Sequence, residues 1–516
     1  MINPVFEKNI KALGQRRSNL VPPILAATSD PPVYSRRIAK NGQAVPAFAD
    51  GVSCNSMYDP GREAAQIAKD CADSGCVVFA GLGGGYHVRE FLRANPVARC
   101  LVAESGFSAF RSLLETVDVS DVLASPRVAV IPDCADESIP KLIASSYLPA
   151  LHGNFRVVSL RPWQMHNEES FRALGALAKR GLEIVSADYS VQAHFGRLWM
   201  HNIMRNLQML SQANRALPEF DTGKKAVVGA AGPGLEDSIP DLRERRSSYV
   251  IFSTDTAYGT LVANGIVPDA FVSIDAQLIS ARHAMHGLKP SVTVIMDLCG
   301  NPEIARVAKA AGCELIITAG SHPLAKYAMS VSPLPEMDTS SGTVTVAALD
   351  AAHSCGFSDV MTVGADFAYV AGKPYARGTY LERQFYHTAT RLVPAETSYD
   401  AIMFRTPVRA RRDTGGITYN TDVLDRYSAA FAAYRGGNRW TKAMFSPFPY
   451  ERFLSLYTSG VSILLSDTSG DDTILFTLLP FVAWRRSRED EEWKATGIAG
   501  ALRLASGLIA GYTGLS

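Results

Sequence analysis

The sequence predicts an α/β fold: a central, doubly wound Rossmann-like sheet, a second Rossmann-like domain before it and a helical region after it. Three observations predict this. Short apolar runs alternate with helical patterns through most of the 516 residues, which is the rhythm of a parallel sheet. Glycine-rich turns follow two of these runs. The rhythm stops near residue 436, and aromatic, helix-like sequence follows.

Residues 1–217 form the first predicted domain. The apolar run Val77–Ala80 is followed by the glycine turn Gly81–Gly85, a helical pattern and a second apolar run that ends at Glu104. Glycine lets a backbone turn tightly and approach a phosphate closely, and an acidic residue after the next strand can bind a ribose. The turn is therefore a candidate site for a dinucleotide or for S-adenosylmethionine. The alternative is a structural joint, and the sequence leaves both open.

Residues 218–435 form the second predicted domain, in which helical patterns separate six apolar runs. The runs are 226–229, 249–252, 270–274, 292–296, 315–318 and 360–363. In a doubly wound sheet the ligand lies beyond the carboxyl ends of the strands, where the strand order reverses. Short polar side chains and glycines follow several of these runs, and such residues suit a nucleotide pocket.

The candidate nucleotide-binding residues share one property: each lies near a strand end or in a turn that opens a helix. The first glycines precede a helix whose free N–H groups would face a phosphate. The candidates are Gly229, Gly232, Pro233, Gly234, Asp255, Asp275, Ser340, Ser341 and Gly342.

At these residues the chain resembles the MptE-like family, which includes the motility-associated factors, or Maf proteins, that glycosylate flagellin. Four segments in a fixed order carry the resemblance: Gly-Ala-Ala-Gly-Pro from Gly229, Gly-Ile-Val-Pro-Asp from Gly265, Ser-Ser-Gly-Thr-Val from Ser340 and Gly-Ala-Asp-Phe-Ala-Tyr from Gly364. The same motifs are similar to those of the family 42 sialyltransferases, which bind CMP-sialic acid.

The resemblance implies a glycosyltransferase that moves a nonulosonic (sialic-like) acid from a CMP-activated donor to serine or threonine of flagellin. It places the glycine turn at the CMP phosphate and ribose, and Tyr369 and Tyr375 near the leaving phosphate, where hydroxyls stabilise developing charge. Asp366 is our preferred general base, with Asp255, His387 and His322 as alternatives. We expect no metal ion and no tightly bound cofactor, the CMP-activated sugar being a substrate.

Two departures from the family 42 pattern bear on the mechanism. Gly234 stands where serine is common, and Ile417-Thr-Tyr stands where the catalytic histidine is expected. Two alternatives remain open, the first because relatives in the family resemble a pterin diphosphokinase and the second because the histidine is missing. One is a 6-hydroxymethylpterin diphosphokinase-like enzyme that uses ATP and Mg²⁺ held by Asp255, Asp275 and Asp366. The other is a non-catalytic factor that binds a nucleotide or flagellin.

Two further groups of basic or polar residues lie outside these motifs. Arg409, Arg411 and Arg412 could clamp a phosphate or a carboxylate, or lie on a solvated loop. Arg205 and Asn206 are expected on a helix surface, in contacts between domains.

Residues 436–516 form the third, helical domain. The net charge of +1, from 51 basic and 50 acidic residues, gives no electrostatic footprint for nucleic acid and no polybasic membrane segment. We find no secretory signal, no apolar stretch of the roughly 20 residues that span a membrane, and no CxxC pair among the eight cysteines. We expect a cytoplasmic protein, with oligomerisation left open.

Overall fold

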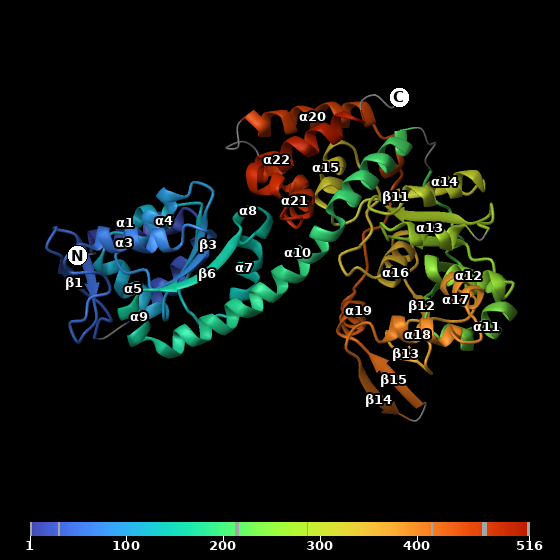
Figure 1. The fold of residues 1–516 in the computed structure, drawn as a ribbon, viewed down its shortest axis with the longest axis horizontal. Helices are drawn as coiled ribbons and strands as arrows, with labels where there is room; N and C mark the ends of the chain where they lie inside the picture. The colour runs from blue at the N-terminus through green and yellow to red at the C-terminus, as the bar shows by residue number, and fades with distance from the viewer. Residues whose placement is uncertain are drawn as a thin grey trace. The chain divides into compact units, whose positions relative to one another are not determined.

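The chain forms two compact units, each built around its own parallel sheet (Figure 1). The computed structural model describes residues 3–28, 31–211, 216–285, 287–413, 416–466 and 472–512. The first unit contains residues 1–194 and 482–498, and the second contains 195–481 and 499–516. The predicted α/β class is confirmed, whereas the division at 217/218 and 435/436 stays a prediction.

The sheet of the first unit has four parallel strands in the order β5 (Val128–Ile131), β4 (Arg99–Ala103), β3 (Ser74–Ala80) and β6 (Asn154–Ser159). Every residue of β3 is buried, as expected for a parallel strand with both faces covered. The predicted order of strand, glycine turn, helix and strand is confirmed, because α4 (Tyr86–Ala94) connects β3 to β4.

Helices and a two-stranded hairpin complete the first unit. Helix α1 packs on α5 and α6, and α3 packs on α4. These elements are α1 (Pro4–Gly14), α2 (Val21–Ala26), β1 (Ser35–Ile38), β2 (Ala44–Ala47), α3 (Pro60–Asp70), α5 (Phe107–Thr116), α6 (Ser120–Ala124), α7 (Ile139–Ser146), α8 (Pro149–His152) and α9 (Arg161–His166).

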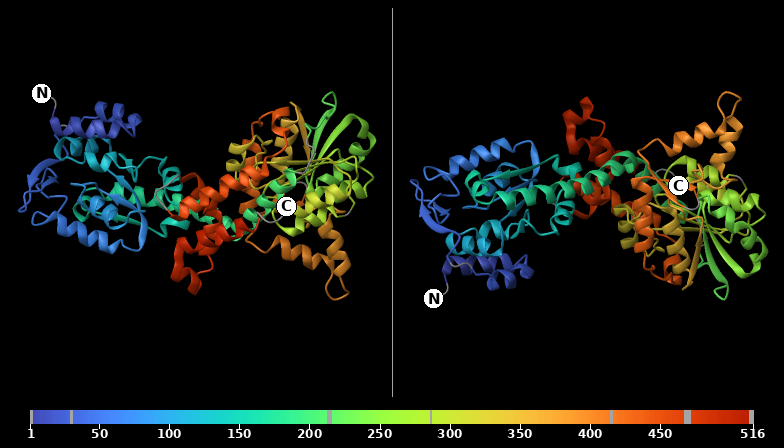
Figure 2. Two further views of the ribbon diagram at one scale, coloured as in Figure 1. Left: turned by 90° about the horizontal axis from the view of Figure 1, so that it is seen from above. Right: turned by 90° about the horizontal axis from the view of Figure 1, so that it is seen from below.

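The sheet of the second unit has six parallel strands in the order β11-β10-β9-β8-β7-β12. Figure 2 shows the fold from two further sides. The chain steps from β7 outward to β11 and then returns to place β12 on the other side of β7, so the strand order reverses there. The strands are β7 (Lys225–Gly229), β8 (Tyr249–Thr254), β9 (Ala270–Ser273), β10 (Thr293–Asp297), β11 (Leu315–Thr318) and β12 (Val360–Val363). All six predicted runs are confirmed as strands.

Two hydrophobic cores cover the two faces of this sheet, because successive side chains of a strand point to opposite faces. In β7, Ala226 and Val228 contribute to the core beneath α16 (Val344–Ser354). Val227 contributes to the opposite core, beneath α11 (Leu235–Glu244) and α12 (Asp255–Ala263). The sheet is therefore doubly wound, as predicted.

A small antiparallel sheet follows β12, in the order β13 (Tyr369–Val370), β15 (Gly416–Asn420) and β14 (Arg409–Asp413). The remaining helices of this part of the second unit are α13 (Leu278–Ala284), α14 (Pro302–Ala310), α15 (Pro323–Val331), α17 (Tyr380–Thr388), α18 (Ala395–Met403) and α19 (Asp422–Ala433).

Long helices lead into and out of the second unit. Helix α10 (Glu168–Ser211) and the C-terminal helices α20 (Tyr450–Ser466), α21 (Asp472–Arg486) and α22 (Glu491–Ala510) confirm the helical character predicted for the end of the chain. Within the described residues, no helix is both long and apolar enough to cross a membrane.

The expectation that Asn206 lies on a helix surface is wrong. Asn206 is fully buried in the second unit, and its Nδ2 donates to the carbonyls of Leu298 and Gly300, at 2.9 Å each. Asn202, one turn earlier on α10, donates to the carbonyls of Ala276 and Cys299. The two amides bind the loops that leave β9 and β10 and hold them against α10.

Candidate functional site

The turn after β7 touches the turn after β12 at the point where the strand order reverses. The Gly234 N–H donates to Oδ2 of Asp366 at 2.8 Å, and the Gly232 N–H donates to the Gly364 carbonyl at 2.9 Å. A Cβ atom at Gly232 or Gly234 would collide with the Asp366 carboxylate. The turn, with Pro233 between its glycines, is therefore shaped around Asp366, and the Gly234 N–H is not a free donor for a phosphate.

Strained backbone follows Asp366. Phe367 and Ala371 have φ values of +46° and +52°, in the left-handed region that non-glycine residues rarely adopt. Such strain persists where the surroundings impose it, and it is common at functional sites. Here Ala376 N–H donates to the Ala231 carbonyl at 2.8 Å, which ties this segment back to the glycine turn.

Asp255 opens helix α12 directly after β8 and is 3% exposed. Its Oδ1 accepts the Thr256 N–H at 2.6 Å, and its Oδ2 accepts the Ser273 hydroxyl at 2.7 Å. Ser273 is the last residue of β9. The carboxylate thus joins the ends of two neighbouring strands, next to Gly229, whose carbonyl accepts the Thr254 hydroxyl at 3.2 Å.

Asp275 and His283 lie close to Asp255. Burial raises the pKa of Asp275, a hydrogen bond from the backbone of Gln277 lowers it, and the charge of Asp255 raises it further. Burial lowers the pKa of the His283 imidazole, and the two carboxylates act against that shift. Among the described residues, no three histidine, cysteine or carboxylate side chains are grouped so that they could hold a metal ion.

Three tyrosines from separate segments share one arginine neighbour, Arg405, and Tyr375 also lies close enough to Asp255 to sense its charge. Burial raises the pKa of Tyr375; Tyr369 and Asp255 raise it further, and Arg405 lowers it. Burial also raises the pKa of Tyr369 and of Tyr427, and Arg405 acts on both of them. Arg405 therefore lies within electrostatic reach of all three hydroxyls. A tyrosine hydroxyl is protonated at neutral pH in any case, and the raised pKa values act in the same direction, so all three hydroxyls can donate hydrogen bonds.

The segment before α16 approaches Tyr427 at Gly342. Both the N–H and the hydroxyl of Ser340 bond to Oδ1 of Asp338, at 2.9 and 2.6 Å, and the Ser341 hydroxyl accepts a backbone N–H at 3.4 Å. A Cβ at Gly342, which has φ +70°, would meet the Tyr427 ring at 4.0 Å. Gly342 thus faces the tyrosines, while the two serines stabilise their own turn.

The alternative histidine bases lie in different surroundings. The Nδ1 atom of His322 accepts the Leu324 N–H at 3.1 Å at the start of α15, and its ring packs edge-on against Trp199. Burial lowers the pKa of His322 to about 3. His387 is exposed in the last turn of α17. The environment of His322 is that of a helix-capping residue.

The basic cluster on β14 is partly neutralised. Arg409 makes ion pairs with Asp422, at 2.6 Å, and with Asp425, so it is not a free clamp for a phosphate. Arg411 and Arg412 are exposed on the same strand.

Sequence reasoning missed His283, Arg405 and Tyr427. They lie on α13, after α18 and on α19, far from the glycine turn in sequence, and no motif marks them. The spacing of His283 after Asp275, at a strand end that opens a helix, is the single signal that could have indicated one of them.

The first glycine turn is closed by the protein's own side chains. The Glu104 carboxylate, which the ribose interpretation requires, is 1% exposed. It accepts hydrogen bonds from the Leu82 N–H at 2.9 Å, Trp163 Nε1 at 2.9 Å and the Tyr34 hydroxyl at 3.0 Å. The Gly84 N–H donates to Asn55 Oδ1 at 2.8 Å. Of the two interpretations, this geometry favours the structural joint.

Comparison with known proteins gives a family and a fold. The family model described as "6-hydroxymethylpterin diphosphokinase MptE-like" matches residues 198–372. An uncharacterized protein of Treponema pallidum (strain Nichols) is 40% identical over 229 residues, which cover 44% of this chain and 80% of the relative. Another from the same organism is 38% identical over 164 residues, which cover 32% of this chain and 78% of the relative.

A solved structure extends the likeness to nearly the whole chain. The structure described as the MAf glycosyltransferase from Magnetospirillum magneticum AMB-1 superposes with a TM-score of 0.54 and 15% identity, over 99% of this chain and 90% of that one. At this level of identity, the likeness shows a shared fold.

Proposed function

We propose that this chain, which belongs to the MptE-like family, is a glycosyltransferase that moves a nonulosonic acid from a CMP-activated donor to a serine or threonine hydroxyl of flagellin. The observation that carries the proposal is that Tyr369, Tyr375 and Tyr427 share one arginine neighbour, Arg405, and that Tyr375 also senses the charge of Asp255, which directly follows β8. The fold shared with a described MAf glycosyltransferase supports it, although a fold alone does not fix a reaction.

These residues suit the departure of a nucleotide. When the bond between the sugar carbon and the phosphate oxygen breaks, the electron pair leaves with CMP, and negative charge develops on the phosphate. Donors already in place stabilise such charge most effectively. In the proposed reaction, Arg405 and the protonated hydroxyls of Tyr369 and Tyr375 supply them.

The position of Asp366 argues against a phosphate at the glycine turn. Its carboxylate already accepts the N–H of Gly234, the residue directly before α11, so a phosphate at that helix end would face a like charge. We therefore place the phosphate at Arg405, the nucleoside near Asp255 and Gly342, and the sugar ring against the glycine turn. This departs from the resemblance, which puts the phosphate at the turn.

Asp366 then lies beside the sugar and remains our choice of general base. Burial raises its pKa, which makes a carboxylate a better proton acceptor near neutral pH. The acceptor hydroxyl would lose its proton to Asp366 as its oxygen bonds to the sugar carbon.

The test is transfer by the full chain, with CMP-N-acetylneuraminic acid and flagellin as the first probes. CMP release and the intact mass of flagellin are measured. Tyr375→Phe and Tyr369→Phe are expected to lower kcat about 10- to 100-fold, and Asp366→Asn about 100-fold or more. Tyr58→Phe, at an exposed tyrosine of the first unit, is the matched control. Wild-type rates in all three site variants would contradict the assignment.

The family description favours a second candidate, a diphosphokinase that moves pyrophosphate from ATP to a hydroxymethylpterin. That reaction needs Mg²⁺ to neutralise the phosphates, and Asp255 and Asp275 would hold the ion. The two candidates differ in the ligand that raises the unfolding temperature. CMP without a metal supports the transferase, and ATP that requires Mg²⁺ supports the diphosphokinase.

A further inference from the structure

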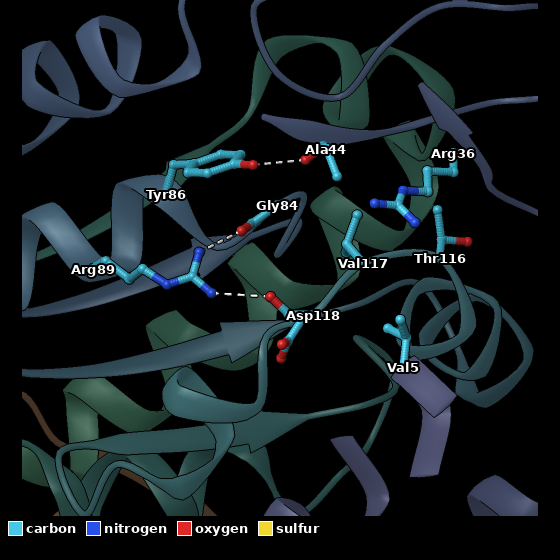
Figure 3. A pocket seen from close by; sticks show the side chains of 9 residues that line it. All are labelled: Val5, Arg36, Ala44, Gly84, Tyr86, Arg89, Thr116, Val117 and Asp118. Carbon is cyan, nitrogen blue, oxygen red and sulfur yellow. Dashed lines mark hydrogen bonds between the residues drawn. The ribbon is translucent and has the colours of Figure 1, made fainter. Parts of the chain in front are cut away.

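A cavity in the first unit lies outside the site described above (Figure 3). Its volume is about 300 Å³, and its lining includes Arg36 of β1, Gly84 of the first glycine turn, Tyr86 and Arg89 of α4, and Asp118. This volume is at the lower end of the range typical of small-molecule sites.

Two arginines reach into this cavity from opposite sides, as Figure 3 shows. Arg89 is held in place: it makes a bidentate pair with Asp121, at 2.7 Å for each bond, and donates to the carbonyls of Gly84 and Asp118. These bonds use four of its five N–H donors. One N–H, on the nitrogen that faces Gly84, is left over.

Arg36 is the uncompensated charge of the cavity. Within the described part of the chain, it takes part in no ion pair. The one carboxylate in the lining, Asp118, is already paired with Lys8 at 2.6 Å. Although burial opposes the shift, the bonds from Lys8 and Ser120 hold the pKa of Asp118 at about 2, so it stays ionised and engaged. The cavity therefore has a net positive charge.

Gly84 of the glycine turn and the adjacent Tyr86 also line the cavity. The Tyr86 hydroxyl donates to the Ala44 carbonyl at 2.7 Å, and a Cβ at Gly84 would collide with the Tyr86 ring. Gly84 thus allows the ring to lie over the turn, and the Tyr86 hydroxyl is fixed to the β1–β2 hairpin that carries Arg36. Glycine at this position serves the shape of the cavity rather than a bound dinucleotide.

We propose that this cavity binds a small hydroxylated metabolite with one oxyanion group, a carboxylate or a phosphate ester. Arg36 pairs with the oxyanion in the two-pronged geometry that guanidinium favours, and the remaining N–H of Arg89 supports it. The carbonyls of Ala44 and Gly84 and the Thr116 hydroxyl accept hydrogen bonds from the hydroxyls of the ligand. The size of the cavity limits the ligand to about the volume of a monosaccharide derivative.

Calorimetric titration of the full chain tests the proposal, with glucuronate, glucose 6-phosphate and uncharged glucose as probes. We expect glucuronate or glucose 6-phosphate to bind and glucose not to bind, and whichever anion binds identifies the oxyanion. Arg36→Gln should weaken that binding at least about tenfold, because a charge-assisted bidentate pair is lost. Its unfolding temperature should not change, since Arg36 is exposed.

Two controls separate this site from its surroundings and from the proposed transferase site. Arg37→Gln, at the next residue of β1, removes a guanidinium that bonds to the Gly51 carbonyl and should leave the affinity unchanged. Tyr375→Phe, in the second unit, should also leave it unchanged, so the outcome does not depend on the proposed transferase. Absence of binding by both anions at about 10 mM, equal binding of glucose, or full affinity in Arg36→Gln would overturn the proposal.

Discussion

Asp366 shows how one side chain determines the residues around it. Its carboxylate lies against two glycines and accepts the N–H that begins α11. An anionic side chain at a helix N-terminus stabilises the helix through the free N–H groups and the dipole. The glycines of the turn are thus explained by the protein's own carboxylate, and a ligand phosphate is not needed to account for them.

A methyl group at Gly232 should therefore be costly. Gly232→Ala places Cβ against the Asp366 carboxylate and the Gly364 carbonyl, and overpacking of this kind costs about 1–3 kcal/mol of unfolding free energy. Urea denaturation measures it. Gly507→Ala, in α22 where a Cβ meets no atom within 4 Å, is the control and should stabilise by about 0.5–1 kcal/mol. Equal effects of the two substitutions would contradict the packing argument.

Asp297 should make the free energy of unfolding fall as the pH rises, the opposite of what a carboxylate stabilised in its charged form does. It is buried at the end of β10, and burial raises its pKa to about 6, against hydrogen bonds that include the Cys299 N–H. A carboxyl whose pKa is higher in the folded than in the unfolded state binds its proton more tightly when folded. Stability therefore falls as the pH rises from about 4 to about 6.

Asp297→Asn should remove this dependence. Relative to the wild type, the variant should gain about 3 kcal/mol of unfolding free energy between pH 4 and pH 7, which is a pKa difference of about two units at about 1.4 kcal/mol each. Urea unfolding of both proteins at several pH values gives the difference and cancels the other titrating groups. A difference that does not change with pH would show that Asp297 titrates normally.

At the scale of elements, the strands were predictable and the long-range polar contacts were not. Apolar runs bounded by turn residues identify buried parallel strands, and all six runs of the second unit are strands. The polar character of Asn206 predicted an exposed position, which is wrong, because the amide bonds to loop carbonyls more than 90 residues away along the chain. The first glycine turn could not be assigned either, since Trp163 and Tyr34, which donate to the Glu104 carboxylate, come from distant segments.

The candidate site was predictable where its residues follow strands, and not where they depend on long-range contacts. Asp255, Asp275 and the glycine turn follow strands, and the sheet brings their positions together without further information. Arg405 and Tyr427 come from the helices and loops after the sheet, whose placement depends on packing that local pattern does not encode.

Removing the Asn206 amide tests the attachment of α10 to the strand loops. Asn206→Ala leaves two buried carbonyls without their donor, and each unsatisfied group costs about 1–3 kcal/mol. We expect a loss of about 2–4 kcal/mol in chemical denaturation. Gln192→Ala, which removes a side-chain bond to Asp188 on the same helix, should cost less than about 0.5 kcal/mol. A small loss at Asn206 would mean that water replaces the amide.

At the scale of the whole molecule, two units with separate cores carry two separate candidate sites. The central site is made of residues between 229 and 427, all within the second unit. The cavity proposed to bind an oxyanion is made of residues of the first unit. Ligand binding stabilises the elements that contact the ligand, and amide hydrogen exchange resolves such stabilisation along the chain.

Hydrogen exchange should therefore separate the two sites in one protein. At a concentration of about 100 times its Kd, a ligand adds about 2.7 kcal/mol of stability to the state that binds it. CMP should slow exchange in the turn after β7, at the start of α12 and in residues 364–378. Exchange at Gly81–Gly85 should not change, because protein donors already enclose the Glu104 carboxylate behind that turn. The anion that binds the cavity should do the reverse, with slower exchange in β1, in the glycine turn and at the start of α4. CMP protection at Gly81–Gly85 would instead place the nucleotide in the first unit and remove the basis for both site assignments.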